Sequence, residues 1–96
     1  MGALWIAHVD VTDEEAYGEY IKVASVVVPE HGGVFIARGG RFIQFEGKER
    51  KRNVVARFPS VEDAVACYQS ERYQEALQFA KGAATRELMV VEEAPA

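Results

Sequence analysis

Cysteine is nearly absent from this sequence, since Cys67 is the only one among 96 residues. A single thiol excludes an intramolecular disulfide framework and any metal site with several thiolate ligands, and it is typical of a reducing compartment. We read Cys67 as a small core residue, because no cationic neighbour in the sequence would activate it. The sequence therefore predicts a cytoplasmic protein.

Positive charge is also scarce, because 15 acidic residues outnumber 11 basic ones and leave a net charge of −4. Nucleic acids and anionic membranes attract basic surfaces, so we expect neither as a partner. No apolar run approaches the ~18 residues that a membrane span needs. The polar residues His8 and Asp10 come too early for the apolar region of a signal peptide.

Motifs that bind common cofactors are missing too. The pairs Gly32-Gly33 and Gly39-Gly40 flank a strand-like segment, whereas a phosphate loop places its glycines between a strand and a helix N-terminus. We interpret these glycines as turns and bends. No carboxylate and second histidine stand at metal-ligand spacing. We predict no cofactor and no bound metal, while haem coordination through one histidine stays open.

Hydrophobic periodicity gives the order of the elements. The segment 3–11 is almost wholly apolar or β-branched, which indicates a strand. A capping box of Thr12 and Glu15 predicts a helix that starts at Asp13 and ends at Val28, before Pro29. A second strand is expected over 34–38, interrupted by the glycine pair and resumed over 41–46.

The second half of the chain repeats this alternation. After a polar connection over 47–52, the segment 53–58 predicts a third strand. Ser60 and Asp63 open a second helix, Ser70 caps its continuation, and Gly82 ends it. The segment 86–93 predicts the last strand. The 96 residues thus form one α+β domain of the ferredoxin-like β-α-β-β-α-β type, with an antiparallel sheet and both helices on one face.

The first strand predicts a partner for the uncovered face of this sheet. Leu4 and Ile6 alternate with Trp5, Ala7 and Val9, so both faces of the strand are apolar although helices cover only one. A chain of this size buries only about 65% of its unfolded surface. We therefore predict a homodimer in which two sheets pack face to face.

Arg38 is the first candidate functional residue. Its alternation with Val34 and Ile36 places it beside two apolar side chains, where an enclosed guanidinium needs a partner. Glu46 in the same hairpin is a candidate partner. Arg38 forms either a structural ion pair across the dimer, which we favour, or a site for a substrate carboxylate or enolate, which its planar fork suits.

Histidines and tyrosines supply the other candidates. His8 shares a strand face with Leu4 and Ile6 and is either a general base, a ligand, or, as we favour, a hydrogen-bonded interior histidine. His31 is most simply a loop residue or a cation at a helix end. Four tyrosines fall on helix faces that we expect to point into the core: Tyr17, Tyr20, Tyr68 and Tyr73.

Several segments resemble the domain-of-unknown-function family 1330, of the dimeric α/β-barrel superfamily. They are HGGVFIARGG, FEG, RNVVARFPSVEDAVACYQSERYQEA and GAATRELMVVE, and VTDEEAYGEY fits the first helix of the family. The residues that match its recurrent motif are Tyr20, His31, Arg38, Glu46, Ser70 and Tyr73. The resemblance implies a ferredoxin-like protomer that forms a dimeric α/β barrel. Cys67 and Ala80 depart from it, where tryptophan and arginine are frequent.

Two functions fit these features. The first is a cofactor-independent enzyme, monooxygenase- or isomerase-like by analogy of fold, that acts on a small organic acid or enolisable compound. Here Arg38 orients the anion, and His8 or Glu46 moves a proton. Ligand-binding roles go to Tyr20, His31, Ser70 and Tyr73. The second is a non-catalytic dimeric small-molecule-binding or accessory protein that uses the same cavity.

Overall fold

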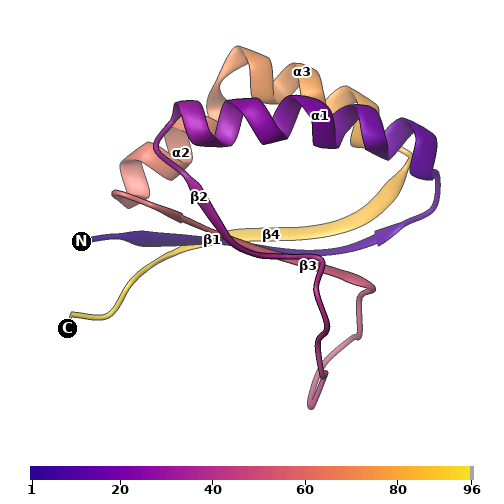
Figure 1. Ribbon diagram of the computed structural model, residues 1–96, viewed down its shortest axis with the longest axis horizontal. Coiled ribbons are helices and arrows are strands. Elements are labelled where there is room, and N and C mark those ends of the chain that lie inside the picture. The colour runs from indigo at the N-terminus through magenta and orange to yellow at the C-terminus, as the bar shows by residue number, and fades with distance from the viewer. Residues whose placement is uncertain (96) are drawn as a thin grey trace.

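Helices cover one face of a four-stranded antiparallel sheet in the computed structural model, which describes residues 1–95 (Figure 1). The strands are β1 (Ala3–Val11), β2 (Val34–Arg38), β3 (Arg52–Phe58) and β4 (Ala84–Glu92), in the sheet order β2-β3-β1-β4. The helices are α1 (Glu14–Glu30), α2 (Val61–Gln69) and α3 (Glu71–Ala80). This arrangement confirms the predicted order of elements.

Side-chain caps set the helix starts. The Ser60 hydroxyl accepts the amide of Asp63, and the Ser70 hydroxyl accepts the amide of Tyr73 at 3.2 Å, as predicted. The prediction of a Thr12 cap is wrong by one residue. The Asp13 carboxylate accepts the amide of Ala16 at 3.2 Å instead, while the Thr12 amide bonds to the Ala83 carbonyl at 2.8 Å. Asp13 is an equally good cap, and the turn before β4 fixes Thr12 outside the helix.

Helix α1 also runs two residues past its predicted end at Val28. Pro29 lacks only its own amide donor, so it costs little in the last turn. The amide of Gly33 donates to the Val28 carbonyl and that of Gly32 to the Pro29 carbonyl, both at 2.9 Å, which satisfies this helix end. A side chain at Gly33 would meet Val28 and Phe58 at under 3 Å, so glycine is required for this close packing.

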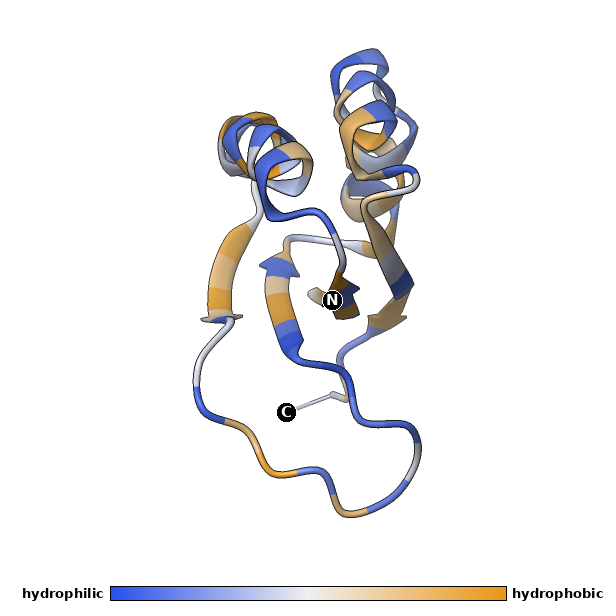
Figure 2. Ribbon diagram, turned by 90° about the vertical axis from the view of Figure 1, so that its right-hand side faces the viewer, coloured by the Kyte–Doolittle hydropathy of each residue, from blue (hydrophilic) through white to orange (hydrophobic). Residues whose placement is uncertain are grey.

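The predicted continuation of the second strand over 41–46 is wrong. Residues 39–51, here called the arm, have no regular structure and project from the sheet face opposite the helices (Figures 1 and 2). Gly39 has a φ of 71°, in the left-handed region, and turns the chain away after β2. The arm exposes Ile43 (66%) and Phe45 (89%).

The core lies between the helices and the sheet. Trp5, Ala7 and Val9 of β1 are buried there, and Cys67 has no exposed surface, as its interpretation as a core residue predicts. The largest fully buried side chains are Tyr73, Phe58, Val9, Val27, Val28 and Cys67. Within residues 1–95, no helix is both long and apolar enough to cross a membrane.

The opposite, open face of the sheet is also partly apolar, as predicted. Ile6 of β1 is flanked by Val55 of β3 and Met89 of β4, and Met89 is 55% exposed. Leu4 lies one pair further along, opposite Val91, which is 41% exposed. Figure 1 shows all three helices on the other side of the sheet, so no helix of the described chain covers this face.

Candidate functional site

A small cavity lies between α1 and the helix-facing side of the sheet. Its enclosed volume is about 30 Å³, and its wall is apolar and aromatic apart from three arginines. The arginines are Arg38, Arg52 and Arg86. Next to it, a surface hollow of about 410 Å³ shares Tyr17, Ile21 and Arg52 with the cavity wall. We take the two adjacent spaces together as one candidate site, with Glu14 and Lys51 in the wall of the open part.

Strand register brings the three arginines to this side of the sheet. Val9 of β1 pairs with Arg52 of β3 on one side and with Arg86 of β4 on the other, so all three residues face the helices. Arg38 pairs with Val54, two residues along β3 from Arg52. Each arginine therefore comes from a different strand.

The predicted orientation of Arg38 is wrong, because β2 contains a bulge. The register shifts between Phe35 and Ala37, so one extra residue reverses the alternation that links Arg38 to Val34. Arg38 consequently faces the helices, where its Nη2 donates to the Ser25 hydroxyl of α1 and its guanidinium lies 4.0 Å from the centre of the Phe35 ring. It makes neither a hydrogen bond nor an ion pair with Glu46, which is exposed on the arm.

Arg86 is partly buried, whereas Arg38 is exposed, and it contacts two tyrosines. Its Nη2 donates to the Tyr20 hydroxyl at 2.8 Å and to the Tyr73 hydroxyl at 3.2 Å, and the two hydroxyl oxygens are 2.6 Å apart. The guanidinium also lies 4.6 Å from the centre of the Tyr20 ring. The Nε atom of Arg86 is buried and has no hydrogen-bond partner within the described chain.

Burial sets the protonation of the two tyrosines. It raises the pKa of Tyr20 far above the ordinary value, and the neighbouring Tyr73 adds to the shift. Burial likewise raises the pKa of Tyr73, although the Arg86 charge partly opposes this. Both phenols therefore remain neutral at physiological pH, where the guanidinium is fully charged. They serve as hydrogen-bond donors and acceptors rather than as bases.

None of the three cavity arginines pairs with a carboxylate of the described residues. Three of the four other arginines do: Arg50 with Asp10 and Glu87, Arg57 with Glu93, and Arg72 with Glu30. The remaining one, Arg41, lies exposed on the arm. The cavity wall includes no aspartate, glutamate or histidine. The enclosed end of the site is thus positive, while Glu14 and Lys51 place one charge of each sign in the wall of the adjoining hollow.

Among the residues predicted from the sequence, the structure brings together Arg38, Tyr20 and Tyr73. His8 lies on the open face of the sheet, with Nδ1 2.6 Å from the Asn53 side-chain oxygen. His31 caps the end of α1, and its Nδ1 is 3.0 Å from the Val27 carbonyl. Ser70 caps α3. His8 and Glu46 therefore do not share the cavity with Arg38 in one protomer.

Sequence reasoning missed Arg86, Arg52 and Tyr17 as site residues. A signal for Arg86 is present, because it alternates with Leu88 and Val90, which also face the helices. This is the same pattern of an arginine within an apolar stripe that singled out Arg38. Tyr68 is the one tyrosine that does not point into the core as predicted, since it is 40% exposed.

No group of three or more histidine, cysteine, aspartate or glutamate side chains within residues 1–95 is placed to hold a metal ion. The polar side chains of the site are instead guanidinium and phenol groups. These groups bind anions and hydrogen-bond acceptors.

Solved structures share this architecture and define its class. A protein of unknown function from Rhodopseudomonas palustris is 19% identical, with a TM-score of 0.78 over 99% of this chain and 84% of the other. A dimeric ferredoxin-like protein of unknown function from Thermobifida fusca is 18% identical, with a TM-score of 0.64 over 97% and 92% of the two chains. The fold is therefore the ferredoxin-like α+β fold.

An enzyme of known activity shares the fold as well. SnoaB from Streptomyces nogalater, a cofactor-independent oxygenase, is 7% identical, with a TM-score of 0.69 over 99% of this chain and 95% of the other. At that identity the similarity concerns the fold alone. In sequence, no curated protein of known function matches the chain.

Residues 2–94 match the family described as domain of unknown function (DUF1330). The chain belongs to this family, as the motif resemblance predicts. The family carries no assigned reaction, so function has to be inferred from the cavity.

Proposed function

We propose that this protein binds a small organic acid in the cavity between α1 and the sheet. The observation that carries the proposal is that Arg38, Arg52 and Arg86 line one largely apolar cavity and none of them pairs with a carboxylate. Arg52 and Arg86 are partly buried, and the buried Nε of Arg86 has no partner among the described residues, which is costly without a counter-ion. A ligand carboxylate would supply that counter-ion, and its planar shape matches the guanidinium fork.

The aromatic wall determines the rest of the ligand. Trp5, Tyr17, Tyr20 and Phe35 line the cavity, and Tyr17 also lines the open hollow. Ligand sites generally combine such apolar walls with a few polar groups that fix orientation. We therefore expect an acid with an apolar or aromatic body, rather than a sugar or a polyol.

The protein acts as a homodimer in this proposal. Support comes from the apolar side chains on the open sheet face and from the dimeric ferredoxin-like neighbour. Face-to-face packing of two sheets would cover Ile6 and Met89 and leave the helix-side cavity accessible. The proposed location is the cytoplasm, because the single thiol of Cys67 suits a reducing compartment.

Binding without catalysis is the function that the cavity supports best. Proton abstraction needs a base within hydrogen-bond reach of the substrate. The enclosed end of the cavity has no carboxylate or imidazole, the Glu14 carboxylate lines only the adjoining hollow, and Tyr20 and Tyr73 are neutral. His8 and Glu46, the proton-transfer residues of the enzyme hypothesis, lie outside this cavity.

A cofactor-independent enzyme is the second candidate. Arg86 and Tyr20 are donors that could stabilise the oxyanion of an enolate, and SnoaB shows that the fold can support an oxygenase without a cofactor. Because the enclosed end offers no base, such an enzyme would need either Glu14 in the adjoining hollow as the base or a substrate acidic enough to ionise in water. Oxygen uptake with a panel of quinols tests this candidate, and wild-type inactivity across the panel would contradict it.

Ligand titration tests the principal proposal. Trp5, the only tryptophan, is 2% exposed in the cavity wall and contacts Tyr73, so its fluorescence should report binding. Acetate, propionate, benzoate and phenylacetate form a panel of increasing apolar size. We expect affinity to rise along the panel and to fall for the corresponding amides. Failure of every acid to bind at millimolar concentration, checked by calorimetry, would exclude the proposed function.

A further inference from the structure

The cluster of Tyr20, Tyr73 and Arg86 contains more hydrogen-bond donors than acceptors. A guanidinium has five N–H donors and no acceptor, and each phenol contributes one O–H donor. Arg86 Nη2 uses both hydroxyl oxygens as acceptors, while the buried Nε–H has no partner among residues 1–95. Buried donors in proteins are normally satisfied. This cluster therefore lacks an acceptor.

The two hydroxyl groups share one hydrogen bond, in which either oxygen can be the donor, so one phenolic proton is left free. Their oxygens are 2.6 Å apart, so one hydroxyl donates to the other. Tyr73 is fully buried and packs edge-on against Trp5, with ring centroids 5.2 Å apart, whereas Tyr20 lines the cavity. The Tyr20 oxygen is the acceptor within reach of the Tyr73 proton. When Tyr73 donates to Tyr20, the proton of Tyr20 is free to point into the cavity.

We propose that Arg86 Nε–H and the Tyr20 hydroxyl together bind the carboxylate of the ligand, with Tyr73 as a positioning residue behind them. This assignment rests on the proposed binding of an organic acid. An ionised carboxylate has only acceptor atoms and matches a donor-only site. A neutral amide would bring its own N–H donors against Arg86. The cluster therefore selects acids over amides of the same shape.

The sizes of the two connected spaces orient the ligand. The enclosed cavity of about 30 Å³ has room for a head group but not for a larger molecule. The adjoining hollow of about 410 Å³ has Val11, Tyr17 and Ile21 in its wall, beside the charged Glu14, Lys51 and Arg52, and can hold an apolar body against the first three. The ligand class is thus a monocarboxylic acid with a compact apolar or aromatic body, inserted head group first.

Two isosteric pairs test this assignment: phenylacetate with phenylacetamide, and benzoate with benzamide. Trp5 fluorescence and calorimetry would give the affinity of each. Charged hydrogen bonds are strong, so we expect Arg86→Gln to weaken acid binding roughly 10- to 100-fold and Tyr20→Phe roughly 10-fold. Binding of the amides should change little. Arg50→Gln, on the opposite sheet face, is the matched control and should leave both affinities unchanged.

Tyr73→Phe tests the positioning role. Without the Tyr73 hydroxyl, nothing donates to the Tyr20 oxygen and orients its O–H toward the cavity. The ratio of acid to amide affinity should therefore fall roughly 3- to 10-fold. A purely structural role would weaken acid and amide equally. An unchanged ratio would therefore overturn the role of Tyr73.

The outcomes separate this inference from the proposed function. Failure of the wild-type protein to bind any acid overturns both. Acid binding that survives Arg86→Gln but is lost in Arg38→Gln or Arg52→Gln overturns only this inference, because the head group then lies at the other end of the cavity. If Arg86→Gln does not fold by circular dichroism, Tyr20→Phe, which keeps the aromatic ring, decides the question.

Discussion

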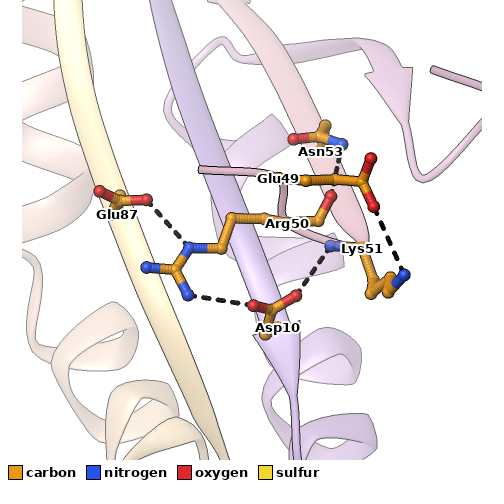
Figure 3. A network of polar contacts seen from close by, with 6 residues as sticks. All are labelled: Asp10, Glu49, Arg50, Lys51, Asn53 and Glu87. Atoms are coloured by element: carbon orange, nitrogen blue, oxygen red, sulfur yellow. Dashed lines mark hydrogen bonds and ion pairs between the residues drawn. The ribbon is translucent and has the colours of Figure 1, made fainter. Parts of the chain in front are cut away.

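The arginines on the two faces of the sheet differ in their partners. On the open face, Arg50 lies between Asp10 and Glu87, at 3.0 and 3.1 Å (Figure 3). On the helix-facing side, Arg86 lies between two neutral tyrosines and has no anion beside it. Arg50 therefore has its counter-ions within the chain, whereas Arg86 has an N–H donor without an acceptor among the described residues.

This difference distinguishes a structural arginine from a functional one. Asp10 accepts the backbone amide of Lys51 at 2.8 Å, and this bond, followed by that to Arg50, lowers the pKa of its carboxyl group. The network thus joins β1, β4 and the end of the arm. Arg86 has no carboxylate partner of this kind among the described residues, and a partly buried charge without a counter-ion is retained at a cost in stability. Proteins accept that cost mainly at functional sites.

The largest expected effect concerns the apolar part of the open face. Ile6→Asp would bury a carboxylate in the proposed dimer interface, once per protomer, and should weaken dimerisation roughly 1,000-fold or more. Light scattering coupled to size-exclusion chromatography measures the change. Val26→Asp, on the exposed side of α1, is the matched control and should remain dimeric. A wild-type monomer at micromolar concentration would contradict the dimer itself.

The next largest effect concerns stability, which the loss of Arg86 and the loss of Arg50 should change in opposite directions. Arg86→Met removes a partly buried charge that has no counter-ion, so we expect the free energy of unfolding without ligand to rise by about 1 kcal/mol. Arg50→Met leaves Asp10 and Glu87 without their partner and should lower the melting temperature. Thermal unfolding of both variants measures the two changes. If both variants shift stability in the same direction, the proposed difference between Arg50 and Arg86 is contradicted.

The smallest effect concerns pH. The folded pKa of Asp10 is lowered, so its contribution to stability is complete above the unfolded value of ~3.9 and is lost as the pH falls through the lowered folded value. Asp10→Asn should therefore destabilise the protein at neutral pH, and the difference from wild type should disappear in acid. Chemical unfolding across this pH range measures it. Glu92→Gln, which removes no ion pair of the described chain, should show no such convergence.

Much of the fold follows from short-range patterns in the sequence. Ser60 and Ser70 cap the helices that they are predicted to cap, and the alternation of Leu4 and Ile6 with Trp5 correctly predicts two apolar sheet faces. These features depend on residues within one turn or one strand. The errors are local as well: Asp13 replaces Thr12 as a cap, and residues 41–46 belong to the arm rather than a strand.

The sequence by itself determined the order of the elements, the apolar character of both faces of β1, and the family. Only the tertiary structure decided the site. A single bulge between Phe35 and Ala37 reversed the face of Arg38, and no periodicity reveals such an extra residue. Tyr20 meets Tyr73 and Arg86 from 53 and 66 residues away. Contacts at that separation depend on strand register and helix packing, which residue spacing along the chain does not specify.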